Sequence, residues 1–267
     1  IVTIQPDSLR ILHNPLTGWV LYASMGVDAA DFWAQYDHMY IPELGHNVSV
    51  TDYAHTLYIR ASWTDFNPQE DVYGWKIDSN LRAYIEGAYQ RNMRLAFRVV
   101  VDSRDKRTEF TPQFVKDAGA KGFMNKSKWS PYSDDPVFQK YYTKFVKALA
   151  KDFNDPSKVE FIDGFGLGKW GEYHTMIYST GDDTPKKAVF DWVTDIYSQA
   201  FDKVPVVINY HRWIGAGKDW VDDEHFAADS EEMLEEAIKK GYSLRHDAFG
   251  MTTYYGSWER RFAKKYR

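Results

Sequence analysis

Apolar and polar positions along the chain follow two alternating periods. Short continuous apolar runs, typical of buried strands, are separated by longer segments in which apolar residues recur every three or four positions, as in amphipathic helices. We predict six strands, at residues 18–23, 55–61, 95–101, 159–165, 204–210 and 244–250. Helix start signals lie between several of them, at Asp78, Asp135-Pro136, Thr184-Pro185 and Ser230. This alternation predicts parallel βαβ units in an α/β fold.

Two α/β architectures share this order of elements, the closed (β/α)8 TIM barrel and the open doubly wound sheet. An open nucleotide-binding sheet carries a Gly-x-Gly-x-x-Gly phosphate loop after its first strand, and residues 22–26 lack it. We therefore predict one barrel domain over residues 1–267. A barrel needs eight strands to close. We expect this chain to lack the last strands, in a missing C-terminal segment or domain; a strand missed in the pattern is the other explanation.

Composition excludes several classes of protein. The 267 residues carry a net charge of -5, and the basic side chains are scattered among acids, so we expect no nucleic-acid partner. No apolar run approaches the length of a membrane helix. The absence of cysteine excludes disulfides, thiolate metal sites and a thiol nucleophile. The chain begins at Ile1 without an apolar leader, which suits a secreted or periplasmic protein after signal removal; an internal fragment would look the same.

Aromatic residues make up 17% of the chain, with ten tryptophans and nineteen tyrosines. Part of this content belongs in a core. Flat amphipathic rings also stack on the apolar faces of sugars, so the excess favours a carbohydrate ligand.

The strongest chemical signal is Glu172. A β-prone run from residue 159 ends in glycine-rich backbone and then presents this acid beside Trp170, Tyr173 and His174. The carboxyl ends of barrel strands form the active-site opening, and an acid among aromatic rings there suits protonation of a glycosidic oxygen. A simpler interpretation is a loop glutamate that caps the next helix or binds a neighbouring lysine. We predict that Glu172 is the catalytic acid.

Three segments resemble a known group of barrel enzymes. Residues 61–78 are similar to the W-x-x-x-x-P-x-x-G-x-Y-x-W-x-x-I-D run after the second strand of barrel glycosidases, with Asp71-Val-Tyr-Gly-Trp replacing Gly-x-Tyr-x-Trp. Residues 163–172 resemble the fourth-strand acid segment of the β-galactosidase-like glycosidases of clan A. With Asn14-Pro-Leu-Thr-Gly-Trp19, these segments resemble a bacterial family of uncharacterised glycoside-hydrolase-like TIM-barrel proteins, often encoded near polysaccharide-degrading enzymes. The resemblance runs from about residue 14 to residue 250.

The resemblance implies that Glu172 is the general acid/base. Clan members have an asparagine before this glutamate that contacts the sugar 2-hydroxyl, and this chain has Gly171 there. The nucleophile of the clan is a glutamate at the end of the seventh strand. That strand is not visible in the sequence, so no residue is assigned this role.

Polar and aromatic residues at the other strand ends complete the predicted site. A buried pair that holds the barrel together explains Arg98 and Asp102 as well as substrate contact does, and His211 has a structural interpretation too. His246 and Asp247 interrupt the sixth strand, where unpaired inward charges would be unfavourable. The predicted substrate-binding residues are Arg60, Trp63, Asp102, Trp170, Tyr173, His174, Asn209, Tyr210, His211, His246 and Asp247. We expect most of them to open onto one cleft with Glu172, and some of the rings to pack as core.

We therefore predict a glycoside hydrolase, acting on poly- or oligosaccharide by carboxylate acid/base catalysis. The alternative is a non-catalytic carbohydrate-binding barrel derived from a glycosidase. No cofactor is expected. A metal-dependent enzyme is a third class, because Asp163, Glu172 and His174 lie close in sequence, but their spacing matches no known ligand pattern and we predict no metal.

Overall fold

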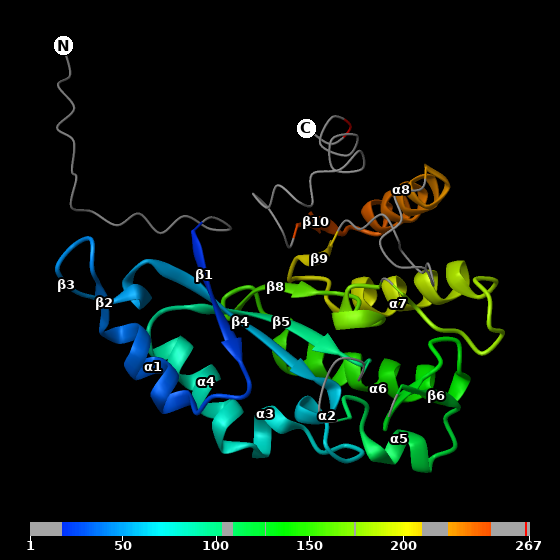
Figure 1. Ribbon diagram of the computed structural model, residues 1–267, viewed down its shortest axis with the longest axis horizontal. Coiled ribbons are helices and arrows are strands. Elements are labelled where there is room, and N and C mark those ends of the chain that lie inside the picture. The colour runs from blue at the N-terminus through cyan, green and yellow to red at the C-terminus, as the bar shows by residue number, and fades with distance from the viewer. Residues whose placement is uncertain are drawn as a thin grey trace.

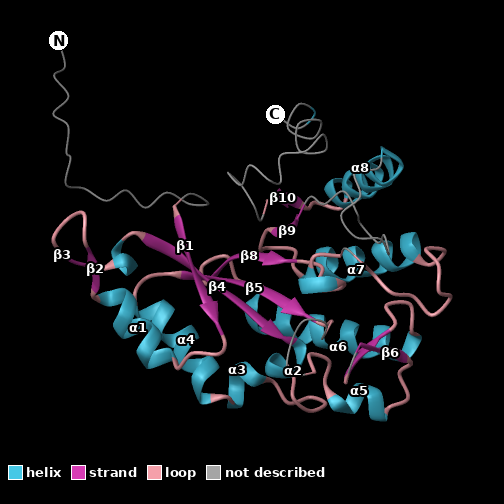
Figure 2. Ribbon diagram, in the orientation of Figure 1, coloured by secondary structure: helices cyan, strands magenta, loops and turns pink. Residues whose placement is uncertain are grey.

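A parallel sheet forms the centre of the molecule (Figures 1 and 2). The computed structural model describes residues 18–102, 109–125, 127–173, 175–209, 224–246 and 265. The six parallel strands run in the order β1 (Trp19–Ser24), β4 (Ala54–Ser62), β5 (Arg94–Val100), β8 (Val159–Asp163), β9 (Val206–Asn209) and β10 (Ser243–Arg245). Each predicted strand is therefore confirmed, although β8, β9 and β10 are shorter than the runs that predicted them.

The order of the strands distinguishes the two architectures. Each strand lies beside the one that precedes it in this sheet, so the chain always advances in one direction. A doubly wound sheet instead begins in the middle and reverses direction at a switch point. Right-handed crossovers that advance in one direction place their helices on one face. The described residues thus form the open, six-stranded part of a (β/α)8-type barrel, and the α/β class is confirmed.

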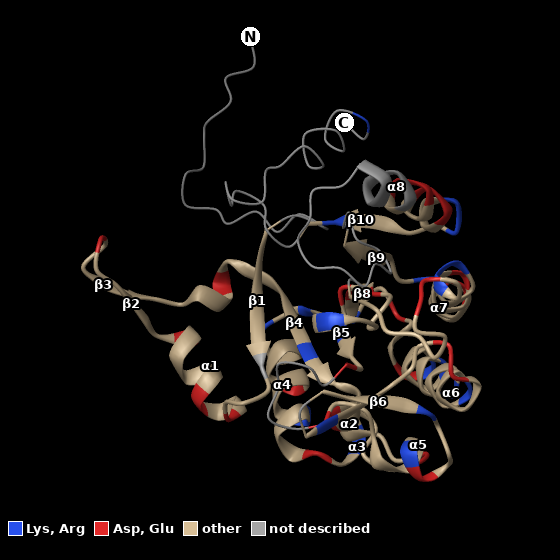
Figure 3. Ribbon diagram, turned by 45° about the vertical axis from the view of Figure 1, so that its right-hand side comes forward, with Lys and Arg blue, Asp and Glu red and all other residues tan. Residues whose placement is uncertain are grey.

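Each successive pair of strands in the sheet is connected through one helix of nine or more residues. Figure 3 shows these five helices along the outer face: α1 (Ala29–Asp37), α4 (Ser79–Gln90), α6 (Pro136–Phe153), α7 (Lys186–Ala200) and α8 (Glu224–Lys239). Asp78 and Asp135 cap α4 and α6 as predicted, by accepting hydrogen bonds from Leu81 N and Phe138 N. The prediction that Ser230 opens a helix was wrong, because α8 begins at Glu224 and Ser230 is buried inside it.

Shorter elements lie in the loops. They are the hairpins β2 (Met39–Ile41)/β3 (His46–Val48) and β6 (Gly122–Asn125)/β7 (Lys128–Pro131), the helices α2 (Trp63–Phe66), α3 (Gly74–Ile77) and α5 (Gln113–Asp117), and the 3-10 turns η1 (Val50–Asp52) and η2 (Lys169–Gly171). The two hairpins were not predicted from the sequence. None of the helices in the described ranges is long and apolar enough to cross a membrane.

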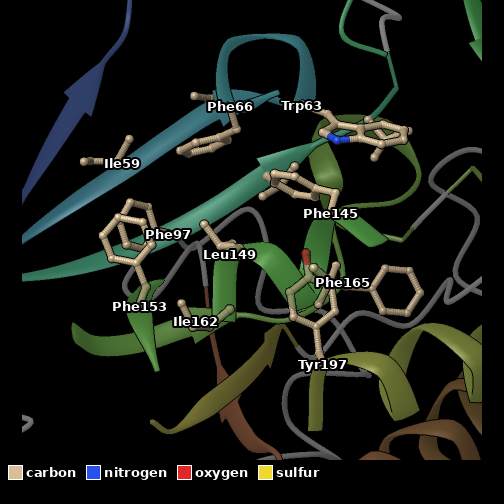
Figure 4. Packing of buried hydrophobic residues seen from close by; sticks show 14 of the residues in the cluster. Ile59, Trp63, Phe66, Phe97, Phe145, Leu149, Phe153, Ile162, Phe165 and Tyr197 are labelled. Carbon is tan, nitrogen blue, oxygen red and sulfur yellow. The ribbon is translucent and has the colours of Figure 1, made fainter. Parts of the chain in front are cut away.

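An aromatic core fills the space between the sheet and the helices (Figure 4). Trp63 is 0% exposed and lies 5.2 Å from Tyr142 and 5.8 Å from Phe145, ring centre to ring centre. The prediction that Trp63 lines the cleft was therefore wrong. Successive strand residues face opposite sides. Trp63 follows the end of β4 and lies four positions after Ile59, so it faces the helices as Ile59 does. Arg60 faces the opposite, inner side of the sheet.

We predict that Trp63→Ala lowers the free energy of unfolding by about 3–5 kcal/mol, because a large buried ring would be replaced by a cavity. Trp19 is the matched control, since it is 76% exposed on β1. Trp19→Ala should change stability by less than about 0.5 kcal/mol. Chemical denaturation of both variants measures the difference, and equal losses would contradict the assignment of Trp63 to the core.

Candidate functional site at the carboxyl end of the sheet

The inner face of the sheet is polar towards the carboxyl ends of its strands. In the strand register Arg60 of β4 is level with Arg98 of β5, which is level with Asp163 of β8. Partner residues of neighbouring parallel strands face the same side, so these three side chains share the inner face. Charges inside a barrel are unfavourable unless they are paired, and the structure shows how these are paired.

Asp163 is the centre of a buried network. Its Oδ2 accepts hydrogen bonds from Arg98 Nε at 2.8 Å and from the Tyr58 hydroxyl at 2.9 Å. Arg245 Nη2 of β10 lies 2.8 Å from the same oxygen as an ion pair. Arg98 also donates through Nη1 to Glu172 Oε1 at 2.7 Å. The side chains of Asp163 and Arg98 are 2% and 3% exposed, whereas that of Glu172 is 17% exposed. Glu172 and Arg245, the latter 19% exposed, are therefore the members that reach solvent, and Glu172 is the acid that does so.

Burial and charge set the protonation of this network. Burial is the largest influence on the pKa of Asp163 and raises it, while the Arg98 charge and the hydrogen bonds from Arg98 and Tyr58 lower it. Burial lowers the pKa of Arg98, but the charges of Asp163, Tyr58 and Glu172 outweigh burial, so that this pKa is raised. Burial, with the charge of Asp163, also raises the pKa of Tyr58 well above its ordinary value. Arg98 is therefore charged and Tyr58 remains a hydrogen-bond donor.

Strained backbone presents Glu172 at the end of β8. Trp170, Tyr173 and Thr175 have φ of 60°, 50° and 50°, a left-handed conformation that non-glycine residues rarely adopt. Such conformations cost about 1–3 kcal/mol each and cluster at functional sites. Gly166 has a φ of 77°, and a Cβ there would lie 2.7 Å from the Val99 carbonyl oxygen, so only glycine fits. The loop is thus held in one shape by close approach to β5.

Arg60 connects this loop to β1 and β4. Its Nη2 donates to the Trp170 carbonyl oxygen at 3.1 Å, and its Nη1 donates to the Tyr22 hydroxyl at 3.4 Å. Lys169 Nζ lies 4.5 Å from the centre of the Trp170 ring. The structure therefore places Arg60 against the backbone of Trp170, two residues before Glu172.

Two other predicted residues, Tyr173 and Asp102, are buried in the structure. The prediction that Tyr173 lines the cleft was wrong, because Tyr173 is 0% exposed and packs edge-on against Phe165 at 4.7 Å. Its left-handed backbone turns the ring into the core. Asp102 is buried and lies 3.4 Å from the Ser130 hydroxyl, its hydrogen-bond donor. The acid that pairs with Arg98 in the barrel interior is Asp163, not the predicted Asp102.

The remaining predicted residues lie on β9, directly after β10, or outside the described residues. Asn209 is buried on β9 and pairs in register with Arg245, and His246 is half-buried directly after β10. His174, Tyr210, His211 and Asp247 lie outside the described residues. Within the described ranges, no group of three or more His, Cys, Asp or Glu side chains could hold a metal ion.

Sequence reasoning missed the roles of Tyr58, Asp163 and Arg245. A signal was present in β4, where Tyr58 and Arg60 are two positions apart and alternate with the apolar residues Leu57, Ile59 and Ala61. Such spacing places both on one face. Asp163 likewise follows Phe161 by two positions in β8.

Comparison with solved structures finds many similar chains, three glycosidases among them. No protein-family model matches the chain, and no curated protein matches it in sequence. An intracellular xylanase of Thermoanaerobacterium saccharolyticum is 10% identical, with a TM-score of 0.46, over 85% of this chain and 61% of the xylanase. An exo-β-1,4-mannosidase of Opitutaceae bacterium strain TAV5 is 15% identical, with a TM-score of 0.48, over 78% of this chain and 36% of the mannosidase. Endo-glycoceramidase II of Rhodococcus sp. is 13% identical, with a TM-score of 0.46, over 89% of this chain and 64% of the glycoceramidase.

The chain spans less than two thirds of the length of each of these enzymes. Identities and TM-scores this low carry no argument about activity or substrate. The barrel-type fold rests on the strand order described above.

We predict that Asp163→Asn lowers the free energy of unfolding by about 3–5 kcal/mol, because it leaves the buried Arg98 charge without its main partner. Glu86→Gln is the control, since Glu86 forms an exposed pair with Arg82 on α4 and such pairs contribute less than about 1 kcal/mol. Urea unfolding at neutral pH measures both variants. A loss at Asp163 no larger than at Glu86 would contradict the network.

Proposed function

We propose that this protein is a glycoside hydrolase that binds poly- or oligosaccharide at the carboxyl end of its sheet and uses Glu172 in acid–base cleavage. One observation carries the proposal. A partly exposed carboxylate, held by a buried guanidinium, stands in strained backbone at the end of a barrel strand. Active sites of (β/α)8 enzymes lie at this end of the strands, and strained backbone of this kind gathers at functional sites.

The ion pair with Arg98 defines what Glu172 does at rest. A guanidinium at 2.7 Å favours the charged carboxylate. In that form Glu172 accepts a proton from water or stabilises the positive charge that develops on the sugar. To donate a proton to the glycosidic oxygen, Glu172 has to be protonated first, which the ion pair with Arg98 opposes. Bound sugar that displaces this contact would favour uptake of a proton from water by the carboxylate.

A second carboxylate is needed for hydrolysis. Asp163, the acid joined to Glu172 through Arg98, is enclosed by Arg98, Tyr58 and Arg245. It therefore cannot contact a sugar, and the second carboxylate would come from another part of the protein. A glycosidase needs this second carboxylate, whereas a protein that only binds carbohydrate does not.

A non-catalytic carbohydrate-binding protein is the second candidate, and the Arg98–Glu172 pair favours it. A carboxylate held by a guanidinium is a strong acceptor for sugar hydroxyls. The exposed ring of Tyr22 and the half-buried ring of Trp170 would supply stacking surfaces in either case. Substrates of plant or microbial polysaccharide origin fit both candidates.

We predict that Glu172→Gln lowers the rate of glycoside hydrolysis by about 10²–10⁴-fold, the usual contribution of a general acid or base. Binding of the same glycoside should change only a few-fold, because glutamine keeps an oxygen that accepts from Arg98. Release of reducing sugar from a glycan panel measures the rate, and isothermal titration calorimetry measures binding. Glu86→Gln should leave both unchanged.

The wild-type protein distinguishes the two candidates. Binding of glycans without hydrolysis of any member of the panel would favour the binding protein. Hydrolysis that is lost with a chelator and restored by a divalent metal would favour a metal-dependent enzyme instead. If the protein neither binds nor hydrolyses any glycan of the panel, both carbohydrate candidates are contradicted.

A further inference from the structure

Three arginine side chains lie on the inner face of the sheet near Glu172. They are Arg60, Arg98 and Arg245, and the acids Asp163 and Glu172 lie with them. Arg98 pairs with both acids, and Arg245 pairs with Asp163. Arg60 forms no ion pair with any of the residues that the structure describes.

Arg60 is half-buried and is held in one place. Its two terminal nitrogens donate to the Trp170 carbonyl oxygen and the Tyr22 hydroxyl, both of which are uncharged. Its Nε is enclosed and makes no hydrogen bond with the described residues. A guanidinium has five donors, so Arg60 has unused donors while its orientation is already fixed. Partial burial of a cation without an anion is unfavourable, and a bound anion would remove this cost.

The surroundings of Arg60 fit a sugar ring. Tyr22 is 48% exposed and touches the guanidinium through its hydroxyl. Trp170, whose carbonyl accepts from Arg60, is two residues before Glu172. A sugar that stacks on the exposed Tyr22 ring would bring its substituents to the Arg60 guanidinium.

We propose that the site takes acidic sugars, with Arg60 binding the carboxylate of a hexuronic acid residue. The proposal rests on the glycosidase-type function proposed above and names the class of its substrate. The planar fork of arginine matches the two oxygens of a carboxylate. A sulfated sugar shares the negative charge but not this planar geometry, so the two kinds of acidic sugar separate experimentally.

The test compares matched ligands on matched variants. The ligands are a panel of uronate oligosaccharides, each with its carboxyl-reduced counterpart, in which a hydroxymethyl group replaces the carboxylate, and a set of sulfated oligosaccharides. The proteins are the full chain, Arg60→Gln, Arg60→Lys and the control Arg82→Gln, which removes an exposed arginine on α4. Calorimetry gives the affinities, and thermal unfolding shows whether each variant is folded.

We expect the wild-type protein to bind at least one uronate about tenfold or more tightly than its reduced counterpart, as for a hydrogen bond between charged groups. Arg60→Gln should remove this preference and still bind the reduced sugar as the wild type does. Arg60→Lys should keep part of the preference, and Arg82→Gln all of it.

Equal binding of the carboxylated and reduced forms would overturn the proposal. So would a preference that survives in Arg60→Gln, or tighter binding of sulfated than of carboxylated sugars. If neutral sugars are nevertheless bound and cleaved in a Glu172-dependent way, the glycosidase function stands and only the substrate class is wrong. If the protein binds no sugar of any series, both the proposed substrate class and the proposed glycosidase function are contradicted.

Discussion

The carboxylate of Asp163 is almost completely shielded from water, and the inner face of the sheet is arranged to satisfy it. Its partners Tyr58, Arg98 and Arg245 come from three different strands, β4, β5 and β10. A buried charge is stable only while such partners stay in place. One oxygen atom therefore fixes the lateral positions of strands that are distant in the sequence, close to the ends from which the loops emerge.

The position of Glu172 depends on the same constraint. Arg98 is oriented by Asp163 through Nε and presents Nη1 to Glu172. The backbone around Glu172 is tied down separately, because Tyr173 N donates to the Leu167 carbonyl at 2.8 Å and Val101 N donates to the Gly166 carbonyl at 3.1 Å. These contacts hold left-handed residues that would relax in an isolated loop. The Glu172 carboxylate is thus carried by a firmly held backbone and remains partly exposed to solvent.

Local pattern was sufficient to predict the frame of the molecule. The six strands follow from apolar runs, and the starts of α4 and α6 follow from Asp78 and Asp135, because capping depends on adjacent residues. The choice of a barrel over a doubly wound sheet followed from the missing phosphate loop, and the strand order agrees with it. The two short hairpins were not predicted, because their strands are too short to show an alternation of apolar and polar residues.

The site was predicted only in part, because side-chain direction depends on strand phase. Arg60 lies against the backbone of Trp170, two residues before Glu172, but Trp63 and Tyr173 turn into the core. In the sequence Asp163 was considered only as a possible metal ligand with Glu172 and His174. Its importance is created by Tyr58 and Arg245, whose approach to it depends on the packed sheet rather than on neighbours in sequence.

The alternation along β4 has an evolutionary consequence. Ile59 and Ala61 belong to the aromatic core, while Tyr58 and Arg60 belong to the polar inner face, although all four are consecutive in the chain. Tyr58 is fixed by its hydrogen bond to Asp163, but substitution of Arg60 leaves the core untouched, so ligand preference at this position is free to diverge while the fold is retained. Deletion of one residue would exchange the two faces at once. Descendants of this protein are therefore expected to differ in β4 by replacement, and to keep its length.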